Sequence, residues 1–221
     1  MQDILQLVDS SPFIERLGLV LLLGVLANVF ADLVLRLRYT SSFRLDTQRK
    51  RMLRLGRWIV CLVGLIAVAL FSPSSSHLIL LALLSVSAAT DFEHRRLPWD
   101  WFLYGSVLVG IGLAWLDHGW DGFSHALIAQ AVLYGFVTMT VVVFGATAGG
   151  DIKVAMQYGS ACGHLGRALN GMLMASVLMI PLSLISLMLY RRLPRYAPLA
   201  SYVWVAALLT YILEGRLASF I

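Results

Sequence analysis

The chain has 221 residues, of which 59% are hydrophobic and only 13% carry a charge, and its mean hydropathy is +0.81. A soluble domain is usually about 45–50% apolar and about 25% charged, so this composition excludes an ordinary soluble domain. It predicts an all-α polytopic membrane helix bundle with about seven or eight transmembrane segments and almost no mass outside the membrane.

The first part of the chain, residues 1–57, is predicted to hold one transmembrane helix and a basic cytoplasmic loop. No signal peptide is expected, because the start of the chain carries Asp3 and Asp9 without a basic residue, and no cleavage site follows the first apolar run. Eight of the 17 basic residues lie between positions 36 and 57, with Asp46 as the only acid among them. Such a run suits nucleic acid, but between two membrane spans it is expected to face anionic lipid on the cytoplasmic side. These residues are Arg36, Arg38, Arg44, Arg49, Lys50, Arg51, Arg54 and Arg57.

The remaining residues, 58–221, are predicted to form the membrane core of the protein. A helix needs about 20 residues to cross a bilayer, so the shorter apolar runs require their flanking residues to do so. Residues 152–163 form the weakest of these runs. The eight candidate spans are 17–35, 58–71, 78–89, 101–116, 124–144, 152–163, 169–190 and 199–213.

Basic and neutral loops alternate along the chain. Residues 72–77 and 117–123 contain no Lys or Arg, whereas the loops that alternate with them are basic. The exception is Arg167, a basic residue in the predicted outside loop before residue 169. By the positive-inside rule, this alternation predicts that both termini lie outside the cytoplasm. It also predicts that Asp91 and Asp151 lie on the cytoplasmic side.

These two aspartates are the candidate catalytic residues. Asp91 follows the apolar run 78–89, and Asp151 follows Gly149 and Gly150. An ionisable group near membrane depth is costly and is therefore a functional hypothesis by default. Two adjacent carboxylates share one proton, so one can take a proton from water while the other donates to a scissile carbonyl; the pair titrates jointly, and neither role is assigned. The glycines allow a sharp turn and a close approach of substrate backbone.

Other interpretations of the two aspartates remain open. Asp151 could cap a helix, and Asp91 could mark the membrane boundary opposite Arg95. Intramembrane carboxylates also form proton or cation relays in transporters and channels, although no two-fold repeat is visible. An inactive scaffold is a third alternative.

The sequence gives little support to other hydrolytic chemistry. The five histidines are scattered and form no His-Glu-x-x-His pair, which a zinc protease would need. Ser160 and His164 lie four residues apart on a possible helix, a spacing that suits contact better than activation of a nucleophile. Cys61 and Cys162 form no CxxC pair, so they predict neither a disulfide nor a zinc site. No metal or other cofactor is expected.

The residues around both aspartates resemble motifs of the prepilin peptidases, a family of bacterial polytopic aspartyl proteases. The first motif is an aspartate, five residues and an apolar-Pro pair, which Asp91 and Leu97-Pro98 match. The second is Gly-x-Gly-Asp, then a small apolar residue and Lys, which the chain matches from Gly149 to Lys153. A looser likeness lies in the proline-bracketed loop 194–199, and the resemblance covers roughly residues 58–213. The chain departs from the motifs at Ala148, which replaces the first glycine, and at Trp99, where the family often has Asn.

The resemblance implies a membrane aspartyl endopeptidase that removes the leader of type IV pilin-like precursors at the cytoplasmic face of the bacterial inner membrane. The chain lacks the CxxC-bearing insert that is associated with pilin N-methylation, so it resembles the short, peptidase-only branch of tight-adherence (Flp) pilus systems. The expected partners are pilin-like precursors and membrane lipid, and no nucleic acid. The basic segment 36–57 would repel a basic leader, which leaves Glu93 and Asp100 as weak candidates for attracting it. Lys153 is expected at the membrane interface.

Overall fold

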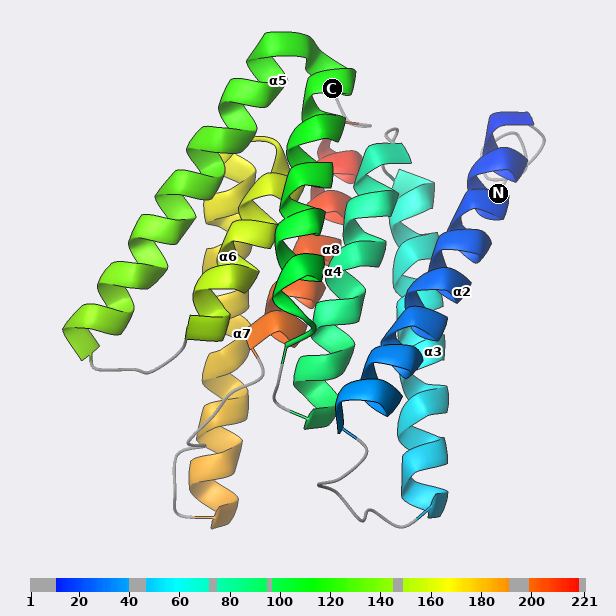
Figure 1. Cartoon of the computed structure of the whole chain (residues 1–221), viewed down its shortest axis with the longest axis vertical. Helices are drawn as coiled ribbons and strands as arrows, with labels where there is room; N and C mark the ends of the chain where they lie inside the picture. Colours follow the sequence, from blue (N-terminus) through cyan, green and yellow to red (C-terminus); the bar gives the residue numbers. More distant parts are fainter. Residues whose placement is uncertain are drawn as a thin grey trace.

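A computed structural model of the chain describes residues 11–39, 47–71, 75–94, 97–144, 149–190 and 199–218. These residues form seven α-helices and contain no strand, so the all-α prediction is confirmed for the described part of the chain (Figure 1). The helices are α2 (Ser11–Tyr39), α3 (Thr47–Phe71), α4 (Ser75–His94), α5 (Asp100–Phe144), α6 (Gly149–Cys162), α7 (Leu165–Tyr190) and α8 (Leu199–Ala218).

All eight predicted apolar runs lie in helices except for Gly163, which follows the end of α6, and α5 holds two of the runs. Its two arms are joined at Gly119, whose φ of 61° and ψ of −140° are not helical. The chain reverses direction there, inside the predicted loop 117–123, so that the two arms of α5 run in opposite directions (Figure 1). Glycine is suited to this turn because it has no Cβ to oppose a positive φ.

Within the described ranges, two segments are long and apolar enough to cross a membrane by length and composition, namely Glu15–Leu37 and Asp100–Met139. Three shorter apolar helical stretches are Ser76–Phe92, Leu165–Pro181 and Leu199–Leu213. The number of membrane crossings therefore stays a prediction.

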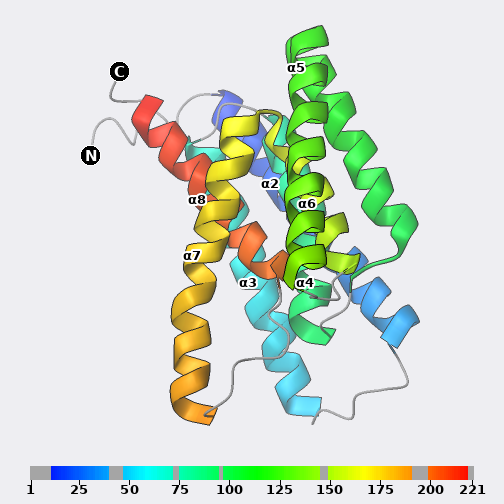
Figure 2. The same cartoon turned by 90° about the vertical axis from the view of Figure 1, so that its left-hand side faces the viewer.

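Helix α4 lies at the centre of the bundle. It contacts α2, α3, α5, α6 and α8, and residues 84–90 along it are all buried. A helix that is apolar on all its faces is expected in such a central position. In Figure 2, α7 crosses α8 on the left of the view, and α5 lies beside α6 on the right.

Helix α6 packs against both arms of α5 through small residues. A Cβ placed on Gly159 would lie 2.8 Å from the Cα of Gln130 in the second arm, and one on Gly110 in the first arm would lie 2.7 Å from the Oγ of Ser160. Without side chains at these glycines, the helix backbones can approach closely.

The basic segment 36–57 is not a single loop, because α2 continues to Tyr39 and α3 begins at Thr47. The prediction from apolar residues alone started α3 at residue 58, which is too late, because Arg and Lys are good helix formers and extend the helix. Residues 40–46 lie outside the described part. Arg54 and Arg57 both pair with Asp32 of α2, with 3.3 Å between the Arg54 Nε and the Asp32 Oδ1.

Candidate active site

Asp91 lies in the last turn of α4 and is half-buried. Its Oδ2 accepts a hydrogen bond of 2.8 Å from the backbone N–H of Ala200, in the first turn of α8. Next to this bond, the hydroxyl of Ser201 donates to the carbonyl of Ala88 at 2.9 Å. Asp91 therefore joins the end of α4 to the beginning of α8, a connection that no sequence motif indicated.

Asp151 is the third residue of α6 and is also half-buried. Burial raises the pKa of its carboxyl group above the ordinary value, because water is removed from the charged form. No hydrogen bond or ion pair joins this carboxyl group to another residue in the described ranges. The proton of Asp151 is therefore held to a higher pH than that of a free aspartic acid.

Both aspartates lie toward the same end of the bundle. Helices α4 and α6 run in opposite directions (Figure 1), and the hydroxyl of Ser87 donates to the Oε1 of Gln157 between them at 2.8 Å. Asp91 lies four residues after Ser87, which places it about 6 Å from this buried bond along the axis of α4, toward the end of that helix. Asp151 lies six residues before Gln157, about 9 Å from the same bond toward the beginning of α6. Because the helices are antiparallel, the two displacements point the same way.

The two segments that carry the motif-like residues meet in space. The side chain of Leu97 lies against Gly150, where a Cβ would stand 3.0 Å from the Leu97 Cδ1. Pro98 is buried beside it, and Gly149 begins α6. Leu97 of the apolar-Pro pair that follows Asp91 thus packs on Gly150, which precedes Asp151, and a side chain at position 150 would require Leu97 to shift.

Lys153 does not pair with either candidate carboxylate. Its Nζ donates to the Oδ1 of Asp100 at 2.7 Å and lies 5.9 Å from the ring centre of Tyr104, both in the first turns of α5. The Asp100 side chain is 64% exposed and that of Lys153 is 28% exposed. Lys153 therefore connects α6 to α5 at the edge of the site, and the Asp100 carboxylate is already paired with a cation. The side chain of Glu93 lies outside the described residues.

Trp99 occupies the turn that leads into α5. Its carbonyl accepts hydrogen bonds from the N–H groups of Phe102 and Leu103 at 3.0 and 3.2 Å, and its ring stacks on that of Trp101 with 5.8 Å between centres. Trp99 therefore helps to start α5. Ala148, Arg95 and residues 194–198 of the proline-bracketed loop lie outside the described residues.

The histidines are less scattered than the sequence indicated. Four of them, on α4, both arms of α5 and the turn before α7, line a pocket of about 460 Å³ at the end of the bundle opposite the aspartates. Among the described residues, no three His, Cys, Asp or Glu side chains form a group that could hold a metal ion. The four are His77, His118, His125 and His164.

Ser160 and His164 do not share a helix, because α6 ends at Cys162 and Gly163 has a φ of 60°. The hydroxyl of Ser160 is buried and donates to the carbonyl of Gln157 at 2.8 Å, one turn earlier. The Nδ1 of His164 accepts from the N–H of Gly166 at 3.2 Å. This arrangement fits a packing serine rather than an activated nucleophile.

Residues 78–185 match the model of the type IV leader peptidase family. This segment belongs to that family. No curated protein and no solved structure gave a match.

The type IV leader peptidase segment runs from the beginning of α4 into α7 and includes both Asp91 and Asp151. The family consists of peptidases, so the match supports a leader-peptidase-like protease. The first turn of α8, which contacts Asp91, lies beyond the matched residues.

Proposed function

We propose that this chain is a membrane aspartyl endopeptidase in which Asp91 and Asp151 form a proton-sharing dyad. One observation carries the proposal: Leu97, six residues after Asp91, packs on Gly150, the residue before Asp151. Membership of the matched segment in a peptidase family supports the hydrolytic chemistry. The raised pKa of the Asp151 carboxyl group fits the protonated member that such a dyad requires.

The dyad would hydrolyse the peptide bond without a covalent intermediate. The ionised carboxylate takes a proton from a water molecule while the water oxygen attacks the scissile carbonyl carbon. The protonated carboxyl group donates its proton to the carbonyl oxygen, which gives a tetrahedral diol. When the diol collapses, the C–N bond breaks and the amine nitrogen takes the proton that the first carboxylate had accepted from water. The other carboxylate takes a proton from a diol hydroxyl group, which restores the dyad, and the leader leaves as a carboxylic acid that ionises in water.

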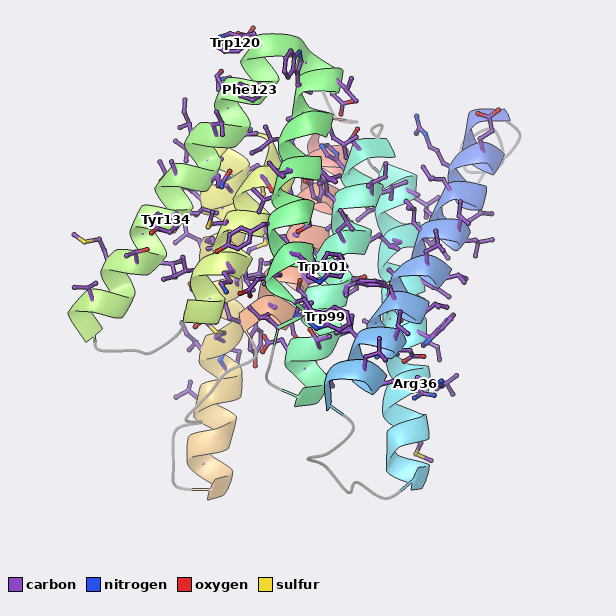
Figure 3. All side chains as sticks on the ribbon, in the orientation of Figure 1. Arg36, Trp99, Trp101, Trp120, Phe123 and Tyr134 are labelled. Atoms are coloured by element: carbon purple, nitrogen blue, oxygen red, sulfur yellow. The ribbon has the colours of Figure 1, made fainter. Side chains whose placement is uncertain are left out.

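The surface of the bundle fits a multi-pass membrane protein. Large apolar side chains are exposed along α2, the second arm of α5 and α7, including Leu22, Met139 and Leu173. Trp120 and Phe123 lie at the turn of α5, and Trp99 and Trp101 lie toward the other end, with Tyr134 between the two levels (Figure 3). Tryptophan favours both membrane–water interfaces, so the two levels support a membrane between them.

Arg36 lies at the end of the molecule toward which α4 ends and α6 begins (Figure 3). If this end is cytoplasmic, as the basic segment 36–57 predicts, both aspartates work at the cytoplasmic face. In this arrangement residues 1–57 form an N-terminal helix with a basic segment, and residues 58–221 form the peptidase core.

The substrate that fits this site is a type IV prepilin-like precursor. The family is one of type IV leader peptidases, and the chain lacks CxxC pairs, which agrees with the short, peptidase-only branch of tight-adherence pilus systems. Because Asp100 is paired with Lys153, it is a weaker attractor for a basic leader than its charge alone indicated. The match is to a peptidase family, and it gives no support to the transporter or channel hypothesis.

The test is to co-express the chain with a pilin-like precursor from the same genome and to measure the size of the precursor. Wild type is expected to shorten it, and both Asp91→Asn and Asp151→Asn are expected to abolish processing. Asp121→Asn, an exposed aspartate at the opposite end of the bundle, is the matched control and should process normally. Processing that survives both dyad substitutions would overturn the mechanism.

A further inference from the structure

The first turn of α8 contacts the Asp91 carboxylate in a way that distinguishes it from Asp151. Leu199 begins α8, so the N–H of Ala200 is one of the first-turn donors that have no acceptor within their own helix. It donates to the Asp91 Oδ2 at 2.8 Å. A backbone N–H can only donate, and a donor is held more strongly by an ionised carboxylate than by a neutral carboxyl group. The positive end of the α8 dipole acts in the same direction.

This donor is held in place by the rest of the contact between α4 and α8. The Ser201 hydroxyl bonds to the Ala88 carbonyl at 2.9 Å, and further along the two helices the indole N–H of Trp204 bonds to the Leu81 carbonyl at 3.1 Å. Both Ala200 and Trp204 are buried. The N–H of Ala200 therefore has a fixed position relative to α4 and does not depend on a flexible side chain.

Asp151 has a different environment. No described residue donates to its carboxyl group, and Lys153, two residues away, pairs with Asp100 instead. Asp151 also lies in the first turn of its own helix, which favours the ionised form. Burial raises the pKa of its carboxyl group, because water is removed from the charged form.

We propose that the first turn of α8 is a positioning element of the active site: the N–H of Ala200 holds Asp91 as the ionised member of the dyad. Asp91 is then the base that takes the proton from water, and Asp151 is the acid that donates to the substrate carbonyl. This assignment rests on the proposed dyad mechanism. The other described titratable groups toward this end of the bundle are Lys153 on α6, Asp100 and Tyr104 on α5, Tyr202 on α8, Asp32 and Arg36 on α2, and Arg54 and Arg57 on α3, of which Asp32 pairs with both arginines of α3.

The first test needs no substrate. The carboxyl groups are titrated in the detergent-solubilised protein by the infrared C=O band of the protonated acid, in Asp91→Asn and in Asp151→Asn. In Asp91→Asn the remaining Asp151 is titrated, and in Asp151→Asn the remaining Asp91. Asp151 should titrate at least about one pH unit above Asp91. Equal or reversed titration would overturn the assignment whether or not the protein cleaves pilins, so this failure is distinct from failure of the proposed function.

The second test removes the donor. Proline has no N–H and is tolerated in the first turn of a helix, so Ala200→Pro deletes the bond to Asp91. Ala200→Gly changes the same position but keeps the N–H, and it serves as the control. A base is active only when ionised, and activity falls as the pH drops through its pKa. Loss of the bond raises that pKa, so Ala200→Pro should move the acid limb of the pH profile of processing up by about one unit and leave the alkaline limb in place.

In these profiles, an unmoved acid limb in a folded Ala200→Pro protein would overturn the role of the Ala200 N–H. If Ala200→Pro does not fold, the same comparison is made with Ser201→Ala, which loosens the contact of α8 with α4. It should move the same limb in the same direction by a smaller amount, and an unmoved limb there would overturn the positioning role of α8.

Discussion

Asp91 caps the first turn of a helix that begins more than one hundred residues later in the chain, since the bond to Ala200 spans 109 positions. A carboxylate that satisfies a helix N-terminus stabilises the fold apart from any catalytic role. Asp91 therefore has two separable properties, a charge that the proposed mechanism needs and an acceptor oxygen for the first turn of α8. Substitutions can remove one without the other.

We expect Asp91→Ala to lower the free energy of unfolding by about 1 kcal/mol, the usual cost of a lost cap, while Asp91→Asn keeps an acceptor oxygen and costs less. Both variants should fail to process a precursor. Thermal unfolding in detergent measures the difference, with Asp121→Asn as a control that should unfold like wild type. An Asp91→Ala protein as stable as wild type would contradict the cap.

For individual residues, the sequence identifies the two aspartates as candidates but does not predict the hydrogen bonds around them. The flanking residues Leu97-Pro98 and Gly149-Gly150 single out both carboxylates as candidates. The bond from Ala200 could not be predicted, because a backbone N–H carries no sequence signal. The bond between Ser87 and Gln157 was missed for a similar reason, since two ordinary polar residues 70 positions apart show no pattern.

Among the elements, the position of α6 depends on glycine. It passes both arms of α5, and at Gly159 the approach is so close that an added Cβ would lie 2.8 Å from the backbone of Gln130. A backbone cannot rotate away as a side chain can. Any residue larger than glycine at this position must push the second arm of α5 outward.

We expect Gly159→Ala to destabilise the protein by about 1–3 kcal/mol, the usual cost of overpacking. The matched control is Gly112→Ala in the first arm of α5, where an added Cβ has no heavy atom within 4 Å. There alanine should be neutral or slightly stabilising, because it favours helix over glycine. Thermal unfolding of both variants in the same detergent provides the comparison. Equal stability of the two would contradict the close packing of α6 on α5.

The boundaries of the elements could be predicted where apolarity or glycine decides them. The turn at Gly119 falls inside the predicted loop 117–123. The start of α3 was placed at residue 58 and lies at Thr47, because charged residues with good helix propensity extend the helix beyond its apolar part. The packing of α4 on both α2 and α8 could not be predicted, since it joins segments far apart in the chain.

For the whole molecule, the distribution of charge predicts its orientation in the membrane. The basic segment 36–57 carries eight of the 17 basic residues, and its Arg36 lies at the opposite end of the bundle from Trp120 (Figure 3). Arg54 and Arg57 pair with Asp32, which reduces the free positive charge of this segment. The unequal charge of the two ends remains, and it predicts that the end with Arg36 is cytoplasmic.

Single cysteines at these two positions test the orientation and, with it, the face at which both aspartates act. Trp120 is 70% exposed and Arg36 is also exposed, whereas the native Cys61 and Cys162 are buried and should react little with a membrane-impermeant maleimide. Trp120→Cys should be labelled in right-side-out vesicles and Arg36→Cys only in inside-out vesicles, with wild type measured in both as the background. Labelling of both cysteines in the same preparation would contradict a membrane between them. The reverse pattern would put Asp91 and Asp151 on the outer face, where a precursor that still carries its leader on the cytoplasmic side could not reach them.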